Sequence, residues 1–177
     1  FGEADVSQQE PRLYADYGRH WRVIDGYNSD PPADMHAIAS SIMGISRDAA
    51  KTLGLSILNG MKGETLARRL GVTRSEADEM MWRFLQVFPG VNAFRADAPR
   101  VARDRGFIRT KLGRRCYSTD PAPTYMGVSR ITQGSAADQM KLMMKRAFEY
   151  CEAPPAVQLL MSIHDSLMFQ AQRGFDL

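Results

Sequence analysis

The sequence predicts a predominantly helical α+β fold, and three observations lead to this class. Most of the chain carries apolar residues at helical spacing, between residues that typically cap helices. The first six residues and the segment after residue 156 instead have the pattern of short apolar strands. The chain has 177 residues, 44% hydrophobic and 24% charged, which is ordinary for one globular domain with a buried core.

The first third of the chain predicts a strand, a helix and a long loop. The strand covers Phe1–Val6, and the helix follows at about Glu10–Arg19. We expect a loop over His20–Ala33, because Asp25-Gly26 and the pair Pro31-Pro32 are turn signals.

Five capped helices are expected between residues 34 and 106. Asp34 and Ser46 are N-cap residues, and Thr73 with Glu76 forms a capping box. Gly71 and Gly106 are typical helix terminators. The helices are expected to end near Met43, Leu58, Leu70, Val87 and Arg105.

The last third predicts a hairpin, a long helix and a second hairpin. The first hairpin turns at Gly113, and the helix is expected to bend at Gly134. The expected elements cover Phe107–Tyr117, Thr124–Cys151, Val157–Ile163 and Leu167–Ala171, with His164-Asp165-Ser166 as the last turn.

The net charge of +3 is mild, but its distribution is uneven. Residues 1–40 hold three basic and seven acidic side chains, whereas residues 95–115 hold eight basic and two acidic ones. One interpretation is an anionic polymer beside a cation-binding centre, and the other is solvated helix faces.

Several protein classes are excluded by composition. No apolar run approaches the roughly 18 residues that span a bilayer, and no signal peptide opens the chain, so we expect no membrane partner. Cys116 and Cys151 form no C-x-x-C pair, which indicates neither a zinc site nor a disulfide framework. We expect a reducing, intracellular compartment, and the Phe1 start favours a piece of a longer chain.

Two aspartates lie where predicted strands end. Asp5 precedes a helix, and Asp165 lies at the tip of an apolar hairpin. Either could be an ordinary cap or turn residue. If their strands pair in one sheet, however, the two carboxylates converge and need cations between them. Paired divalent ions are the arrangement that promotes phosphoryl transfer.

Two further patterns lie on predicted helices. Residues at i, i+4, i+8 and i+12 form one stripe that suits a triphosphate, a sugar and a base, or else a solvated basic edge with Leu55 in the core. These residues are Arg47, Lys51, Leu55 and Asn59. The segment Gln133–Asp138 combines small residues with a polar Gln, which fits either a contact to a base or a tight helix crossing.

The four patterns occur together and in order, and they resemble the motifs of family A DNA polymerases, the bacterial polymerase I type, especially phage members. The segment Asp5-Val-Ser-Gln-Gln-Glu-Pro-Arg12 is similar to D-Y-S-Q-x-E-x-R, and Arg47 to Gly60 is similar to R-x3-K-x7-Y-G. Gln133-Gly-Ser-Ala-Ala-Asp138 is similar to Q-G-T-A-A-D, and His164-Asp165-Ser166 to H-D-E. The resemblance covers essentially the whole chain.

The resemblance implies a right-hand polymerase fragment that is truncated at both ends. Residues 1–33 and 107–177 would belong to the palm, with its antiparallel sheet, and residues 34–106 to the helical fingers. The thumb and any exonuclease domain would precede Phe1. Primer–template DNA and deoxynucleoside triphosphates would be the partners, and two Mg²⁺ ions the cofactors.

The resemblance also implies a role for each matching residue. Asp5 and Asp165 would hold the magnesium ions together with the carbonyl of Val6. Gln8 would shape the sugar pocket, and Glu10 would exclude a ribose 2′-hydroxyl. The triphosphate would be gripped by Arg47 and Lys51, and Lys51 would also protonate the pyrophosphate. The DNA would be contacted by Gln133, His164, Arg114 and Arg115.

Three positions depart from the family pattern. Leu55 stands where an aromatic ring usually packs on the incoming sugar, and Asn59 replaces a Tyr near the templating base. Ser166 replaces the acid after the second metal aspartate. These changes concern sugar discrimination and template positioning rather than the metal site.

The implied function is template-directed DNA synthesis in phage or bacterial replication, carried out in the cytoplasm. A primer 3′-hydroxyl would gain deoxynucleotides by two-metal transfer with release of pyrophosphate. A single-subunit phage-type RNA polymerase and a non-catalytic helical DNA-binding module are the alternatives. Glu10 and the Gln133–Asp138 motif favour the DNA enzyme over the RNA enzyme.

Overall fold

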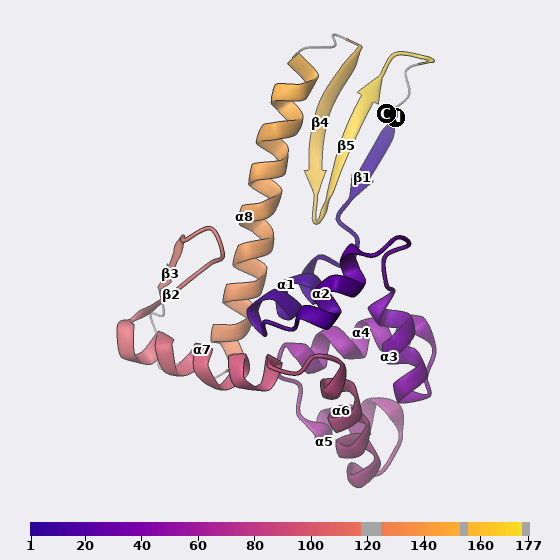
Figure 1. Cartoon of the computed structure of the whole chain (residues 1–177), viewed down its shortest axis with the longest axis vertical. Helices are drawn as coiled ribbons and strands as arrows, with labels where there is room; N and C mark the ends of the chain where they lie inside the picture. The colour runs from indigo at the N-terminus through magenta and orange to yellow at the C-terminus, as the bar shows by residue number, and fades with distance from the viewer. Residues whose placement is uncertain (118–124, 153–155, 175–177) are drawn as a thin grey trace.

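The computed structural model describes residues 1–117, 125–152 and 156–174, and it confirms the predicted fold class. These residues form a mostly helical α+β structure with two small antiparallel sheets (Figure 1). The strands are β1 (Gly2–Asp5), β2 (Phe107–Arg109), β3 (Arg115–Tyr117), β4 (Val157–Ile163) and β5 (Ser166–Ala171). The helices are α1 (Gln9–Tyr17), α2 (Trp21–Asn28), α3 (Met35–Met43), α4 (Arg47–Leu58), α5 (Gly63–Leu70), α6 (Arg74–Val87), α7 (Val91–Arg105) and α8 (Tyr125–Glu152).

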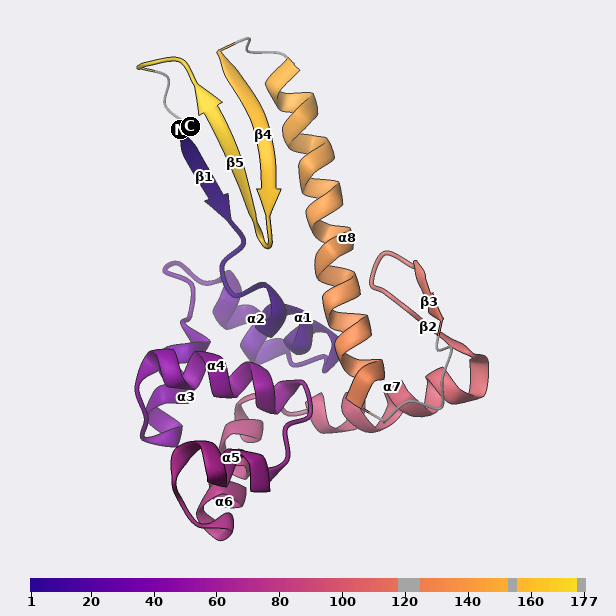
Figure 2. The same ribbon diagram turned by 180° about the vertical axis from the view of Figure 1, so that it is seen from behind.

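The larger sheet has the order β1-β5-β4, with both neighbouring pairs antiparallel. The long helix α8 runs beside this sheet and packs against β4 (Figures 1 and 2). The remaining helices gather beyond the end of the sheet where β1 leads into α1. The small β2–β3 hairpin lies on the other side of α8 from the large sheet. The sheet and the helical cluster thus meet near Asp5.

A single hydrophobic core joins the helical cluster. Its largest fully buried members come from α1, α4, α5 and α7, each less than 2% exposed, namely Tyr14, Ile57, Leu58, Leu66 and Val91. Burying such side chains is the main favourable term in folding, at about 1.5–3 kcal/mol for each aliphatic one. Because all eight helices of the described residues contribute to it, the core fixes their mutual positions and hence the side chains that point away from it.

The predicted helix caps are confirmed. The Asp34 carboxylate accepts hydrogen bonds from the backbone N–H groups of His36 and Ala37, and Ser46 Oγ accepts one from Ala49 N. Thr73 and Glu76 form the reciprocal capping box that was expected. Such caps satisfy N–H groups that have no partner inside the helix.

The loop predicted over His20–Ala33 is wrong in its first half, because Trp21–Asn28 form helix α2. Val23 and Tyr27, spaced four residues apart, are buried in the core and stabilise the helical conformation. Gly26 is a packing residue, because a Cβ there would lie 3.3 Å from the Cβ of Ala33. The apolar spacing was therefore a better guide than the turn signal.

At Gly134, where a bend was expected, α8 continues without interruption from Tyr125 to Glu152. A Cβ on Gly134 would lie 3.1 Å from Arg114 Nη2 and 3.1 Å from Thr110 Cγ2. The missing side chain makes room for the β2–β3 hairpin. Thr124, the expected first residue of this helix, lies outside the described residues.

Among the described residues, no helix combines the length and the apolar character that crossing a membrane requires.

Candidate active site

The backbone pairing of β1 with β5 places the two candidate metal aspartates next to each other. Asp5 is the register partner of Ser166, and the backbone N–H of Val6 donates to the carbonyl of Asp165 at 2.9 Å. His164 and Asp165 form the two-residue turn between β4 and β5, and His164 adopts a left-handed φ of 55°. A non-glycine residue in this conformation is uncommon and often marks a functional site.

A cleft of about 530 Å³ opens between this sheet end, α1, α4 and α8. Nine of the residues predicted from the sequence line it, and they come from four separate motifs. They are Asp5, Gln8, Glu10, Arg47, Lys51, Leu55, Gln133, His164 and Asp165. Acidic groups from the sheet end therefore lie in the same cleft as cations from α4, an arrangement that suits a magnesium-bound polyphosphate.

Helix α4 presents its polar face to the cleft because its other face is buried. Ala50, Leu53 and Ile57 are nearly inaccessible and pack in the core. Arg47 and Lys51 are exposed, one turn apart, and Leu55 is half-buried below them. These three residues therefore share one face of α4 and line the cleft, and Leu55 lies outside the buried core. Their contact with a nucleotide stays a prediction.

Asn59, the fourth residue of the stripe, lies outside the cleft lining but contacts the expected sugar gate. Its Nδ2 donates to Glu10 Oε2 at 3.4 Å and to the carbonyl of Leu55 at 3.0 Å. Its Oδ1 accepts from Tyr14 Oη at 2.8 Å and from Ser129 Oγ at 3.0 Å. Burial raises the pKa of Tyr14, so its hydroxyl stays protonated and remains a donor. The amide of Asn59 thus fixes Glu10 to the core.

Gln8 connects the first motif to the start of α3. It lies in the left-handed region at φ 56°, directly before α1. Its Nε2 donates to the carbonyl of Ala33 at 3.3 Å, and its Oε1 accepts from Met35 N at 3.0 Å. Gln8 therefore ties the segment after Asp5 to the helix that packs on α4.

His36 is a cleft residue that the sequence analysis missed. It lies at the second position of α3, is 7% exposed, and lines the cleft with Arg47 and Lys51. Burial lowers its pKa; Asp34 opposes this shift, while Arg47 and Lys51 add to it. A neutral imidazole at neutral pH can donate one hydrogen bond to a phosphate. The sequence indicated His36 only by its place two residues after the strong N-cap residue Asp34.

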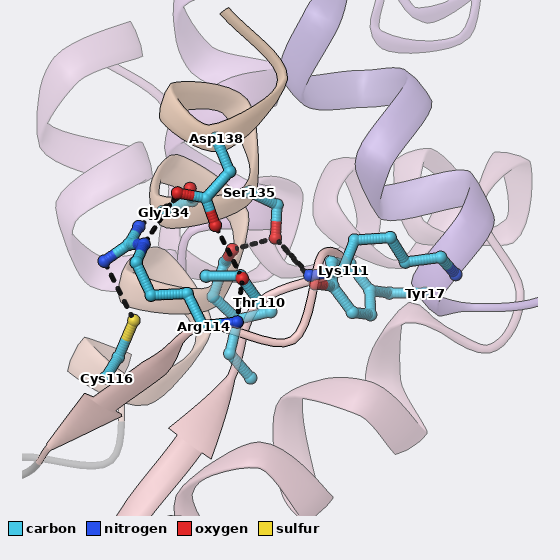
Figure 3. A network of polar contacts seen from close by, with 9 residues as sticks. Tyr17, Thr110, Lys111, Arg114, Cys116, Gly134, Ser135 and Asp138 are labelled. Carbon is cyan, nitrogen blue, oxygen red and sulfur yellow. Dashed lines mark hydrogen bonds and ion pairs between the residues drawn. The ribbon is translucent and has the colours of Figure 1, made fainter. Parts of the chain in front are cut away.

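The Gln133–Asp138 motif has two different surroundings on the two faces of α8, and contact of Gln133 with a base stays a prediction. One face lines the cleft with Gln133, Ala136, Ala137 and Met140. The other face packs on the β2–β3 hairpin, as Figure 3 shows. There, Asp138 accepts from Thr110 Oγ1 and Arg114 Nε, both at 2.6 Å. Ser135 Oγ accepts from Lys111 N at 3.0 Å and shares a hydrogen bond with Tyr17 Oη.

The two predicted DNA-binding arginines of the hairpin do not line the cleft. Arg114 is held by Asp138 and by the carbonyl of Gly134. Arg115 is exposed on β3, with its guanidinium 4.9 Å from the centre of the Phe107 ring. Their contact with DNA stays a prediction.

The donor groups fit a magnesium site that a substrate completes. Within the described residues, no three His, Cys, Asp or Glu side chains gather closely enough to hold a metal by themselves. Mg²⁺ in nucleotide enzymes is typically bound by one or two carboxylates together with phosphate oxygens and water. Asp5 and Asp165 supply such a pair at the edge of a cleft that also holds cations.

Comparison with known proteins agrees with this geometry. The family described as DNA polymerase family A matches residues 1–175. The chain belongs to DNA polymerase family A. Within this family, DNA polymerase DpoZ of Salmonella phage PMBT28 is 30% identical over 91% of this chain and 30% of the relative's length. The thermostable DNA polymerase I of Thermus aquaticus is 31% identical over 96% of this chain and 22% of its own.

A solved family A structure has the same fold. The POL domain of Pol1 from M. smegmatis, in complex with DNA primer-template and dNTP, superposes with a TM-score of 0.84 at 26% identity. The match covers 97% of this chain and 33% of that one. The chain thus spans about a third or less of the length of these relatives.

Proposed function

We propose that this protein carries the nucleotide-addition site of a DNA-directed DNA polymerase. Its reaction is the attack of a primer 3′-hydroxyl on the α-phosphorus of a deoxynucleoside triphosphate, which forms a phosphodiester and releases pyrophosphate. The observation that carries the proposal is the convergence of four sequence motifs on one cleft. Family membership and a relative solved with primer-template and dNTP support it.

Some residues of the chain bind the nucleotide, and others position it. Arg47 and Lys51 bind the triphosphate from α4, where Arg offers a planar fork and Lys a point charge. Lys51 also supplies the proton that the pyrophosphate leaving group takes up. Glu10 closes the space beside the sugar C2′, so that a ribose does not fit.

Asp5 and Asp165 would hold two magnesium ions, with the carbonyl of Val6 as a further oxygen donor. Bound there, the ions would supply Lewis-acid chemistry, lowering the pKa of the primer hydroxyl and neutralising phosphate charge. Gln133 and His164 contact the primer–template beside the growing end. Residues 1–33 and 107–177 act as the palm in this proposal, and residues 34–106 as the fingers, which close on the nucleotide.

Primer extension by the intact protein that contains this sequence tests the proposal. We expect extension with dNTPs and Mg²⁺, and none after chelation with EDTA. Extension with NTPs instead would indicate the RNA polymerase, whereas DNA binding with no magnesium-dependent nucleotide binding would indicate a non-catalytic module. We place the activity in phage or bacterial DNA replication in the cytoplasm, in line with the phage relative.

A further inference from the structure

The carboxylate of Asp34 joins the start of α3 to the triphosphate-binding face of α4. Its Oδ1 accepts from the backbone N–H groups of His36 at 2.9 Å and Ala37 at 3.1 Å. Its Oδ2 accepts from Arg47 Nε at 2.8 Å. Thus Oδ1 caps α3, whereas Oδ2 contacts the arginine that lines the cleft.

The contact with Asp34 leaves most of the Arg47 guanidinium available to a ligand. A guanidinium has five N–H donors, and Asp34 uses the one on Nε. The structure gives no other hydrogen bond to this group within the described residues, and its side chain is 52% exposed. The four N–H groups on the two Nη atoms remain for phosphate oxygens, which Arg binds in a bidentate manner.

A free Arg side chain would lose rotational freedom when it binds a phosphate. This loss is about 2 kcal/mol for a fully mobile side chain. An ion pair that already holds the guanidinium beside the cleft moves part of this cost from binding to folding. The pair is too exposed to stabilise the fold by much, because such surface pairs contribute about 0–1 kcal/mol. Its main effect is therefore on where Arg47 lies.

We propose that Asp34 is a positioning residue, which holds Arg47 in the orientation that binds the triphosphate. The inference rests on the proposed function of the cleft. Capping alone does not account for the geometry, because Oδ1 alone accepts from the helix N–H groups and Gln8 accepts from Met35 N. Although burial opposes ionisation of Asp34, the hydrogen bonds from Arg47 and the backbone lower its pKa, which keeps it charged at neutral pH.

Two variants of Asp34 separate capping from positioning. Asp34→Asn keeps a good N-cap oxygen but replaces Oδ2, the acceptor for Arg47, with an NH2 group that can only donate. Asp34→Glu keeps the carboxylate, although its longer side chain is a poor cap. In the intact protein we expect the dNTP KM of Asp34→Asn to rise about 3- to 10-fold, with kcat changed less than about 2-fold. Asp34→Glu should show a smaller rise.

Other roles for Asp34 predict different results. A capping role alone predicts that Asp34→Glu is impaired and Asp34→Asn is normal. A purely electrostatic role predicts a lower KM for Asp34→Asn, because a negative charge near the triphosphate is removed. Either result overturns the proposal. Thr73→Ala, which removes the cap of α6, is the matched control for a lost cap and should leave the dNTP KM unchanged.

A double-mutant cycle with Arg47→Ala makes the decisive measurement. If Asp34 acts through Arg47, Asp34→Asn adds no further rise in KM once Arg47 is removed. Additive effects would overturn the inference while leaving the proposed function intact. Absence of magnesium-dependent extension by the unmodified protein would instead refute the proposed function.

Discussion

A side-chain amide connects the carboxylate of Glu10 to the helical core. Asn59 donates to Glu10 and accepts from the fully buried Tyr14. All four hydrogen-bonding positions of the Asn59 amide are used. The position of the Glu10 carboxylate therefore depends on Asn59 and, through it, on a buried residue of α1.

Sugar selectivity should follow the size of residue 10 rather than its charge. We expect Glu10→Ala to reduce discrimination against ribonucleotides by about 10- to 100-fold, because it opens space for a 2′-hydroxyl. Glu10→Gln has nearly the same shape and can still accept from Asn59, so it should retain most of the discrimination. The ratio of kcat/KM for dNTP and NTP measures both. Equal selectivity in all three proteins would argue against the steric role.

Residue-level prediction succeeded where a motif imposes its own geometry. The spacing of Arg47, Lys51 and Leu55 follows directly from the helix period, so their shared exposure could be deduced from the sequence. The position of Asn59 could not, since it depends on Tyr14 and Ser129 from two other helices. His36 was missed for a similar reason, because its place in the cleft depends on how α3 packs against α4.

At the scale of elements, the β2–β3 hairpin is attached to α8 through Asp138. The carboxylate is 8% exposed and binds Thr110 and Arg114. Burial raises the pKa of Asp138, but the hydrogen bonds from Thr110 and Arg114 outweigh it, so the pKa is lowered. The charged form is therefore the form that the fold prefers.

Asp138→Asn should lower the free energy of unfolding by about 1–2 kcal/mol at neutral pH, given that Arg114 is half exposed. A group whose pKa is lowered by folding stabilises above its unfolded pKa, here about 3.9. The contribution is lost as the pH falls through the lower folded value. Urea denaturation of both proteins should thus give a difference at pH 7 that shrinks below about pH 4. A constant difference would assign the effect to packing.

A second element-level prediction concerns the close approach of α1 and α7. Gly90 has φ 91°, and a Cβ on it would lie 2.2 Å from the carbonyl oxygen of Gly18. Gly90→Ala should cost more than about 2 kcal/mol, from both strain and the clash. Gly44→Ala is the control, because Gly44 also has positive φ but no atom lies within 4 Å of its Cβ position. It should cost about 1 kcal/mol in the same denaturation assay.

Helix boundaries could be predicted wherever the sequence contains a capping residue. Asp34, Ser46 and Thr73 each marked a helix start to within a residue. Glycines were less informative, since Gly26 was interpreted as a turn signal and lies inside α2. In the structure Gly134, like Gly26, lies inside a helix and admits a neighbouring side chain. A glycine that allows close packing cannot be distinguished from a turn glycine by sequence alone, because the side chain that packs against it is not yet known.

At the scale of the whole molecule, a ligand should bind both sides of the cleft at once only when magnesium and nucleotide are both present. Asp5 and Asp165 lie on the sheet, and the cations lie on α4. We expect a dNTP at about 100 times its Kd to stabilise the intact protein by about 2.7 kcal/mol in Mg²⁺, and clearly less in EDTA.

Asp5→Asn or Asp165→Asn should remove the magnesium dependence of this stabilisation and reduce extension by about 1,000-fold or more. Affinity for primer–template should change little. Asp97→Asn, which affects an exposed ion pair of α7, is the matched control and should behave as the unmodified protein. Undiminished extension by either site variant would refute the metal assignment.

The pairing of β1 with β5 also determines which insertions the protein can tolerate. Asp5 and Asp165 are far apart in sequence, yet their relative position depends on one hydrogen-bonded register. Extra residues in the exposed turns between helices leave that register untouched. One extra residue within β1 would turn Asp5 to the opposite face of the sheet. We therefore expect length differences among related chains to fall in the segments between the two strands rather than within the strands.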